Sequence, residues 1–200
     1  MAGEFLLTIG NTDQLSQIHG QGLGGYHYPR FAMVGRSNVG KSSLINVLLG
    51  SRLARVSNQP GKTRNLHFYL WKDSKKIIVD LPGYGYARAS HTERDRWGEF
   101  IKAYLESDEG LERVLVLLDA RHGPTEIDCK AIQFLSSLGI PVTFVFTKFD
   151  ELKNQSMRAK RRKEGAAALK GFQALPDQIF WVSAKENLGL KDLIHFLSDL

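Results

Sequence analysis

The sequence predicts a doubly wound α/β fold, a mostly parallel sheet of six strands with helices on both faces. Segments with strand and helix patterns alternate from residue 30 to the end of the chain, as in folds that wind helices around a parallel sheet. Several strand segments are apolar throughout, which is typical of strands buried on both faces. Because ligands of such folds bind at the carboxyl ends of the strands, we expect the functional motifs there.

The elements follow in order along the chain. Strands are expected at 30–34, 66–71, 75–80, 113–119, 142–147 and 179–182. Only Lys72, Asp73 and Ser74 separate the second strand from the third, so this pair is expected to be an antiparallel hairpin. Helices are expected at 41–50, 92–106, 125–138, 156–172 and 189–199, the third of them capped by Thr125.

The chain is expected to form one domain. Its 200 residues are 42% hydrophobic, enough for a sizeable core. Residues 28–200 are assigned to this domain, and residues 1–27, with a Gly-rich stretch at 20–25, to a flexible N-terminal extension. The sequence shows one cysteine, Cys129, and no signal-peptide, membrane-spanning or lipidation pattern. We therefore expect a soluble cytoplasmic protein without a disulfide.

The chain is basic, with a formal net charge of +6 that is partly concentrated at 158–163. A basic surface suits nucleic acid as a partner. The same run also fits a solvated helix face. Charge alone leaves these two interpretations equally open.

Residues 35–42 read Gly-Arg-Ser-Asn-Val-Gly-Lys-Ser and follow an apolar segment, the pattern of a phosphate-binding loop between a strand and a helix. Its glycines let main-chain N–H groups point at a phosphate. Lys41 adds a cation for the β- and γ-phosphate oxygens, and the Ser42 hydroxyl can bind Mg²⁺. The nucleotide contacts predicted in this loop are Gly35, Arg36, Ser37, Asn38, Val39, Gly40, Lys41, Ser42 and Ser43.

Two further segments complete the predicted phosphate and metal site. Asp80 ends an apolar segment and opens Asp-Leu-Pro-Gly, so its carboxylate can reach Mg²⁺ through water while the Gly83 N–H faces the γ-phosphate. In the polar loop before the second strand, Thr63 is expected to join the Mg²⁺ shell and the γ-phosphate, with Gly61 and Lys62 beside it. The expected metal ligands are Ser42, Thr63 and Asp80, and the expected catalytic residues are Lys41, Thr63 and Gly83.

The base is predicted from Thr147-Lys148-Phe149-Asp150, which follows an apolar segment and resembles the guanine signature of GTPases. Asp150 can accept hydrogen bonds from the ring N–H and the exocyclic amine of guanine, whereas it would stay unpaired against adenine. The Lys148 stem can lie along the base plane, and a later Ser-Ala-Lys loop is expected to offer a main-chain N–H to the guanine oxygen. The predicted base contacts are Thr147, Lys148, Asp150, Val182, Ser183, Ala184 and Lys185.

Five motifs in this order resemble the translation-factor-related GTPases, and more closely the EngB family of bacterial ribosome-biogenesis GTPases. The resemblance covers roughly residues 28–200, and the segments nearest to that family are 35–46, 60–63, 80–87 and 119–122. It implies a cytoplasmic GTP/GDP switch with Mg²⁺ that assists assembly of the large ribosomal subunit. It also implies ribosomal RNA as the partner of the basic surface, and a link to cell division and septation. We expect a monomer that binds neither DNA nor membranes.

Two positions bear on catalysis, and a third is assigned another role. Tyr84 follows Asp-Leu-Pro-Gly, where Ras-like enzymes carry the glutamine that orients the attacking water, so we expect slow intrinsic hydrolysis that a partner accelerates. In related GTPases with this phosphate loop, the asparagine equivalent to Asn38 helps to bind K⁺, and bracing of the loop is the alternative role. Arg121 follows a buried segment, and we expect it to be structural or to contact a partner.

Two other function classes stay open. A signalling GTPase that binds protein effectors would usually carry a lipidation signal and the glutamine, and this sequence shows neither. A P-loop ATPase or kinase is disfavoured by Lys148 and Asp150.

Overall fold

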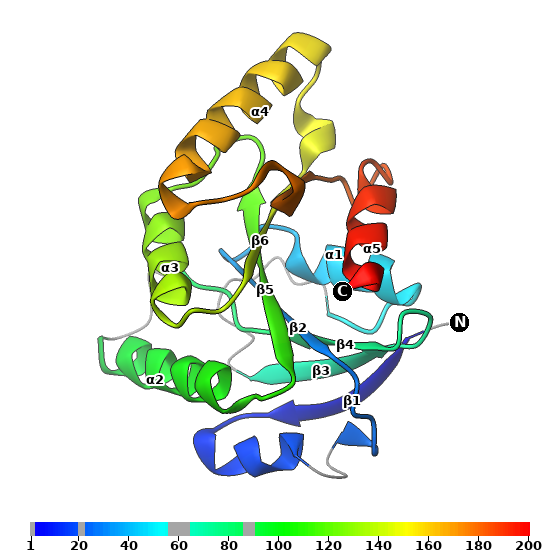
Figure 1. Cartoon of the computed structure of the whole chain (residues 1–200), viewed down its shortest axis with the longest axis vertical. Coiled ribbons are helices and arrows are strands. Elements are labelled where there is room, and N and C mark those ends of the chain that lie inside the picture. The colour runs from blue at the N-terminus through cyan, green and yellow to red at the C-terminus, as the bar shows by residue number, and fades with distance from the viewer. Residues whose placement is uncertain (1–2, 20–22, 56–64, 86–90) are drawn as a thin grey trace.

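A computed structural model describes residues 3–19, 23–55, 65–85 and 91–200. Within these residues, seven strands form one sheet in the spatial order β1-β3-β4-β2-β5-β6-β7 (Figure 1). The strands are β1 (Glu4–Ile9), β2 (Arg30–Gly35), β3 (Leu66–Trp71), β4 (Lys76–Asp80), β5 (Leu111–Asp119), β6 (Val142–Thr147) and β7 (Ile179–Trp181). The five strands from β4 to β7 in this spatial order are parallel, whereas β3 pairs antiparallel with β4, and β1 with β3. The doubly wound fold and the antiparallel hairpin are both confirmed.

Helices cover both faces of the sheet. Figure 1 shows α1 and α5 on one face and α2 and α3 on the other. The α-helices in the described residues are α1 (Lys41–Leu49), α2 (His91–Ser107), α3 (Glu126–Ser137), α4 (Gln155–Leu169) and α5 (Leu190–Asp199). Short 3₁₀ helices are η1 (Thr12–Ile18), η3 (Phe149–Glu151), η4 (Lys170–Phe172) and η5 (Pro176–Gln178). No helix in the described part of the chain has both the length and the apolar character needed to cross a membrane.

The expected boundaries agree with the structure to within two residues, with one exception. The helix expected at 156–172 ends as an α-helix at Leu169, and its last turn is the 3₁₀ helix η4. The chain leaves η4 at Gln173, whose main chain is left-handed, with φ of 56°.

Side chains alternate along the central strands and divide the core into two layers. In β2, Ala32 and Val34 pack on the side of α2 and α3, whereas Phe31 and Met33 pack on the side of α1 and α5. A strand that buries both faces has no polar side to show in its sequence. This is why the uniformly apolar segments predicted the central strands.

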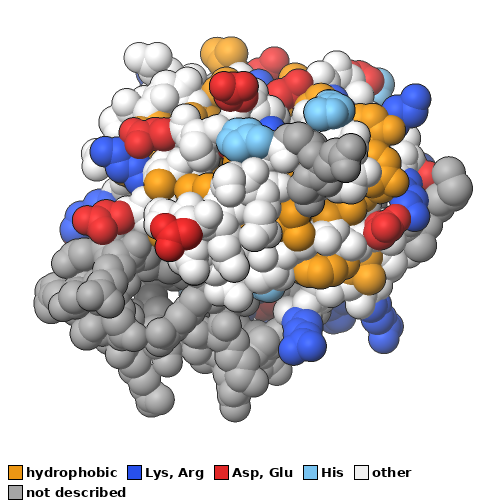
Figure 2. All heavy atoms as spheres, turned by 90° about the horizontal axis from the view of Figure 1, so that it is seen from below, with side chains coloured by type: hydrophobic (Ala, Val, Ile, Leu, Met, Phe, Trp, Pro, Cys, Tyr) orange, Lys and Arg blue, Asp and Glu red, His pale blue; other side chains and the backbone are white. Residues whose placement is uncertain are grey.

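The N-terminal segment differs from the expectation. Residues expected to be flexible instead form β1, which adds a seventh strand at the sheet edge, and η1, which packs against α2. Leu15 and Ile18 of η1 are buried, and Asn11 caps it by accepting a hydrogen bond from the Gln14 N–H. β1 is an edge strand with several partly exposed residues, among them Phe5, 47% exposed, so its sequence lacks a clear period-two pattern. Figure 2 views this end of the molecule, where Lys and Arg lie mainly toward the rim.

Candidate functional site

The residues expected at strand ends lie along one edge of the sheet. β4, β2, β5 and β6 are parallel neighbours, and they end at Asp80, Gly35, Asp119 and Thr147. The register pairs Asp119 with Thr147 and places Asp80 opposite Met33 of β2. The fold therefore brings together, at one edge, motifs that are far apart in the sequence.

The phosphate loop turns directly from β2 into α1. The Val39 N–H donates to the Arg36 oxygen at 3.1 Å, and Gly40, the N-cap of α1, has φ of 110°, which side chains rarely tolerate. Asn38 is also left-handed, with φ of 63°, and its side chain is exposed. Since the first N–H groups of a helix have no partner within it, this turn can hold an anion.

Lys41 and Asp80, which were predicted to contact phosphate and Mg²⁺, lie together in this site. The Lys41 ammonium forms a hydrogen-bonded ion pair with the Asp80 carboxylate, which is buried at the end of β4. Ser42 follows Lys41 in the first turn of α1.

The donors in this region fit Mg²⁺. This ion keeps several waters and takes one or two protein oxygens in addition to phosphate oxygens. Asp80 and Ser42 offer a carboxylate and a hydroxyl. Within the described ranges, no cluster of three His, Cys, Asp or Glu side chains could form an all-protein metal site. Two protein oxygens beside a phosphate-binding turn are the number that this ion takes together with phosphate oxygens.

The segment after Asp80 lies against the phosphate loop. The Tyr84 N–H donates to the Gly35 oxygen, and the Ser37 N–H donates to the Tyr84 oxygen, both at 3.2 Å. A Cβ on Gly83 would lie only 3.1 Å from the Gly35 oxygen and 3.2 Å from the Ser37 nitrogen. Glycine at 83 thus lets the two main chains approach closely.

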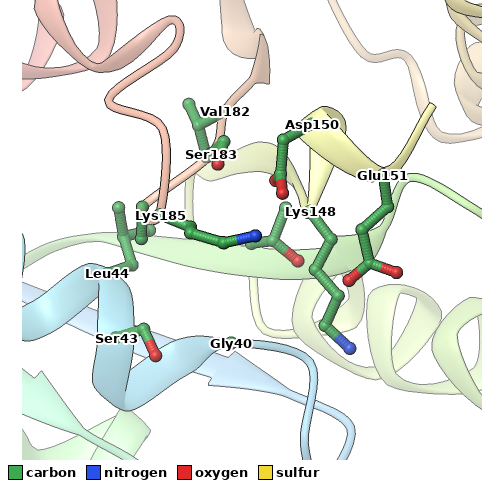
Figure 3. A pocket seen from close by; sticks show the side chains of 11 residues that line it. Gly40, Ser43, Leu44, Lys148, Asp150, Glu151, Val182, Ser183 and Lys185 are labelled. Atoms are coloured by element: carbon green, nitrogen blue, oxygen red, sulfur yellow. The ribbon is translucent and has the colours of Figure 1, made fainter. Parts of the chain in front are cut away.

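The predicted base contacts surround a cavity of about 150 Å³ (Figure 3). It lies between the start of α1, the loop after β6 and the loop after β7. In Figure 3, Asp150 and Lys185 reach toward the same space from the two loops. Sequence reasoning missed two lining residues, Leu44 and Glu151. The lining residues are Gly40, Ser43, Leu44, Thr147, Lys148, Asp150, Glu151, Val182, Ser183, Ala184 and Lys185.

Hydrogen bonds between the loops hold this cavity in shape. The buried Thr147 hydroxyl donates to the Val39 oxygen at 2.5 Å. This bond joins the segment 147–150 after β6, called the base loop, to the phosphate loop. The Phe149 N–H donates to the Val182 oxygen at 3.1 Å. In the Ser-Ala-Lys loop, the Ser183 N–H donates to the Leu188 oxygen and the Ser183 hydroxyl accepts from the Glu186 N–H, both at 3.0 Å. These bonds commit the polar groups of Ser183 to the turn, so an N–H for the base is better supplied by the following residues.

Asp119 is the main site residue that sequence reasoning missed. Its buried carboxylate accepts from the Lys148 ammonium at 3.0 Å and from the Arg121 guanidinium at 2.6 and 2.9 Å. Arg121 also binds Glu151 at 2.8 Å. Burial alone would raise the pKa of Asp119, but the hydrogen bonds from Arg121 and Lys148 outweigh it and hold that pKa well below its ordinary range. The sequence offered one signal for it: Asp119 ends the segment 113–119 just as Asp80 ends the segment 75–80, so both carboxylates lie at the same edge of the sheet.

The Asp119 bonds assign Arg121 a structural role, one of the two roles expected for it. Arg121 fixes the carboxylate that in turn holds the Lys148 side chain beside the cavity. Gly61, Lys62 and Thr63 lie outside the described residues.

The chain is similar in sequence to known proteins. The family described as 50S ribosome-binding GTPase matches residues 30–148. The probable GTP-binding protein EngB of Ligilactobacillus salivarius is 41% identical over 174 residues, which cover 86% of this chain and 86% of that protein.

Solved structures show the same similarity. The structure of a probable GTP-binding protein engB superimposes with a TM-score of 0.62 at 26% identity, covering 85% of this chain and 95% of that chain. Era in complex with MgGDPNP and nucleotides 1506–1542 of 16S ribosomal RNA superimposes with a TM-score of 0.68 at 26% identity, covering 86% of this chain and 56% of that chain.

Proposed function

The chain belongs to the EngB family of GTP-binding proteins, and we propose that it is a GTP-dependent switch that assists assembly of the large ribosomal subunit. As a member of a GTPase family, it hydrolyses GTP to GDP and phosphate. One observation carries the proposal: a phosphate loop and a base cavity share one site in a chain that matches a family described as 50S ribosome-binding. The ribosomal RNA structure of the related Era supports an RNA partner.

The nucleotide would lie along the edge formed by the strand ends. We assign the base to the cavity around Asp150, the β-phosphate to the N-terminus of α1, and the γ-phosphate to Lys41 and the Gly83 N–H. Ser42, Asp80 and Thr63 would hold Mg²⁺, which supplies positive charge against the phosphate oxygens. Lys41, Thr63 and Gly83 are the proposed catalytic residues, because each would touch the transferring phosphate or its metal.

We propose that intrinsic hydrolysis is slow. Tyr84 stands where Ras-like enzymes carry the glutamine, and its hydroxyl donates to Asp128 at 2.8 Å. A hydroxyl committed to a carboxylate cannot also orient an attacking water as the glutamine amide does. A partner that inserts a further group would then accelerate the reaction.

We propose that Asn38 helps to bind a K⁺ ion that assists hydrolysis. It is exposed in the phosphate loop, with its main chain in the left-handed region, so its amide oxygen is accessible to an ion beside the phosphates. Bracing of the loop is the alternative. Hydrolysis rates in K⁺ and in Na⁺ distinguish them: a faster rate in K⁺ supports the ion, and equal rates exclude it.

Helix α4 is the proposed contact with RNA phosphates. Figure 1 shows α4 at the end of the molecule farthest from β1. Its exposed residues include Lys160, Arg162 and Lys163, and Glu164 is the one acidic residue in its sequence. Such a surface binds an anionic backbone without selecting a sequence.

Not all arginines of α4 face solvent. The Arg158 guanidinium donates to the Leu152 oxygen at 3.0 Å, and that of Arg161 to the Arg121 oxygen at 2.7 Å. Arg158 and Arg162 also lie over the ring of Phe149, at 5.2 and 5.0 Å from its centroid. Part of the basic run therefore packs on the base loop, and Lys160 and Lys163 are the better candidates for RNA.

Co-sedimentation with ribosomal subunits tests the proposed function. Purified protein is mixed with large or small subunits, with a non-hydrolysable GTP analogue, with GDP or without nucleotide, at near-physiological salt. Preferential pelleting of the GTP form with the large subunit is the expected result. A K160E/K163E variant should pellet less, whereas the charge-matched control K102E/K191E, on α2 and α5, should behave like the native chain. Binding that is the same in all nucleotide states and with both subunits would contradict the proposal.

The alternative is a signalling GTPase that acts on protein effectors away from the ribosome. Nucleotide-dependent capture of proteins, together with no ribosome binding, would favour it. We further propose a cytoplasmic monomer that binds neither DNA nor membranes. The implied link to cell division and septation stays a prediction.

A further inference from the structure

Polar groups from three segments meet at Asp128 of α3, a side chain that is fully buried. The Tyr84 hydroxyl donates to its Oδ1 at 2.8 Å. The Nε of Arg36, in the phosphate loop, lies 3.3 Å from its Oδ2. The same Oδ2 accepts from the N–H and the hydroxyl of Thr125, at 2.8 and 2.6 Å. One buried carboxylate thus contacts the phosphate loop, the segment after Asp-Leu-Pro-Gly and the start of α3.

Local helix capping explains only part of this arrangement. Asp128 forms a capping box with Thr125 at the start of α3: its carboxylate accepts from the Thr125 N–H, and the Thr125 side chain accepts from the Asp128 N–H. This cap would need no other residue. Tyr84 and Arg36 come from outside the helix. Tyr84 donates a hydrogen bond to Asp128, whereas the buried Arg36 Nε makes no hydrogen bond and contacts the carboxylate as an ion pair. Burying these polar groups costs free energy that the hydrogen bond and the opposite charge offset. A carboxylate that holds both is therefore placed to fix one loop against the other.

The protonation state of Tyr84 supports a hydrogen bond from its hydroxyl to the Asp128 carboxylate. Burial, followed by the nearby Asp128 charge and the hydrogen bond to it, raises the pKa of Tyr84 far above its ordinary value. The hydroxyl therefore keeps its proton and donates it.

This hydrogen bond acts next to the proposed γ-phosphate contact. The main chain of Tyr84 exchanges hydrogen bonds with Gly35 and Ser37 of the phosphate loop, both at 3.2 Å. Gly83 immediately precedes it and lies too close to the same loop for any side chain to fit without adjustment. A shift of the tyrosine ring would move the Gly83 N–H.

We propose that Asp128 is a positioning residue which, through the Tyr84 hydroxyl and Arg36, fixes the Gly83 N–H against the phosphate loop and thereby sets the preference for GTP over GDP. The inference rests on the proposed placement of the γ-phosphate at Gly83, and it does not depend on the ribosome. GDP has no γ-phosphate, so a group that contacts only that phosphate changes the affinity for GTP alone.

The Y84F variant tests the proposal in the purified chain with nucleotides and Mg²⁺ alone. It removes the hydroxyl and keeps the ring. Affinity for a non-hydrolysable GTP analogue should fall about tenfold, the loss expected for one hydrogen bond to a charged acceptor, and affinity for GDP should change by less than about twofold. Y26F is the matched control, since Tyr26 stacks on Tyr28 and belongs to none of the site motifs, and it should leave both affinities unchanged.

A second pair of variants separates the possible failures. D128N removes the charge of the acceptor and keeps an oxygen, so it should lower the GTP-analogue affinity in the same direction as Y84F. The double variant should lose little more than Y84F alone, because both changes act on the same hydrogen bond. Additive losses, or an equal fall in GDP affinity, would overturn the positioning role. G83A tests the γ-phosphate placement itself. An unchanged GTP preference in G83A would overturn that placement and the inference with it, while the ribosome co-sedimentation result would still stand.

Discussion

The Thr147 hydroxyl donates a hydrogen bond to the main-chain oxygen of Val39, so that the base loop is tied to the phosphate loop across 108 residues of sequence. The same hydroxyl lies 3.2 Å from the Leu118 oxygen at the end of β5. Through this one side chain, the two halves of the nucleotide site are held at a constant separation.

Replacing Thr147 with valine should weaken binding of GTP and GDP to the same extent. The change keeps the shape of the side chain but leaves a buried carbonyl without its partner, at a cost of about 1–2 kcal/mol in the free energy of unfolding. Urea unfolding and nucleotide titration check both effects.

T143V is the matched control for T147V. Thr143 is equally buried in β6, where its hydroxyl contacts Arg113 away from the cavity. This variant should lose stability while its nucleotide affinity stays normal. If T147V lowered the affinities for GTP and GDP by different factors, Thr147 would do more than fix the distance between the two loops.

Replacing Asp150 with asparagine should change the base that the chain prefers. The amide can no longer accept both guanine donors, so GTP affinity should fall about 100-fold or more. Xanthine carries a carbonyl where guanine has its exocyclic amine, so the new amide N–H can donate to it and XTP should bind better than GTP. Competition against a fluorescent guanine nucleotide measures both changes.

E151Q controls for a general effect on the cavity, because Glu151 also lines it. Its nucleotide affinities should stay within about twofold of the native chain. If D150N bound GTP like the native protein, the base would lie elsewhere.

Replacing Asp119 with asparagine should destabilise the fold in a pH-dependent way. The folded pKa of Asp119 lies below its ordinary value of 3.8 because Arg121 and Lys148 outweigh the effect of burial. The ionised group therefore stabilises the native state fully above about pH 5, and this contribution is lost as the pH falls through 4 toward the folded pKa. The difference in unfolding free energy between native chain and D119N should be about 1–3 kcal/mol at pH 7.

Chemical unfolding at pH 7, 5 and 3.5 checks the sign of this effect. The difference should be constant between the first two values and smaller at the third. D13N, at an exposed position, should show almost no difference at any of them. A difference that grows on acidification would mean that the carboxyl is destabilised when ionised.

Replacing Gly165 with alanine should destabilise the packing of α4 on the sheet. A Cβ at this position would lie 2.8 Å from Trp181 and 2.9 Å from Phe146, two rings that stack with their centroids 3.9 Å apart. Since neither ring has room to move freely, we expect a loss of about 1–3 kcal/mol in unfolding free energy, despite the better helix propensity of alanine.

G171A is the matched control for G165A. A Cβ on Gly171 would have no atom within 4 Å, so thermal unfolding of this variant should be unchanged or slightly improved. Equal midpoints for the two variants would show that the rings adjust.

Local patterns were sufficient for most of the fold and for most of the residues that line the cavity. The uniformly apolar segments predicted β2, β5 and β6, because these strands are buried on both faces. The edge strand β1 was missed, because neither its sequence, Glu-Phe-Leu-Leu-Thr-Ile, nor its burial alternates as expected for a half-exposed strand. Most residues around the cavity were anticipated because they lie in short motifs with fixed spacing.

The sequence by itself determined the doubly wound fold, the phosphate loop and the guanine motif, since each depends on residues that are neighbours along the chain. Only the tertiary structure decided what those motifs are bonded to. Asp119 could be recognised as the partner of Lys148, and Asp128 as the partner of Tyr84 and Arg36, only once the sheet had brought them together. A side-chain hydrogen bond between distant segments depends on separations of a few ångströms, and no pattern of neighbouring residues records those separations.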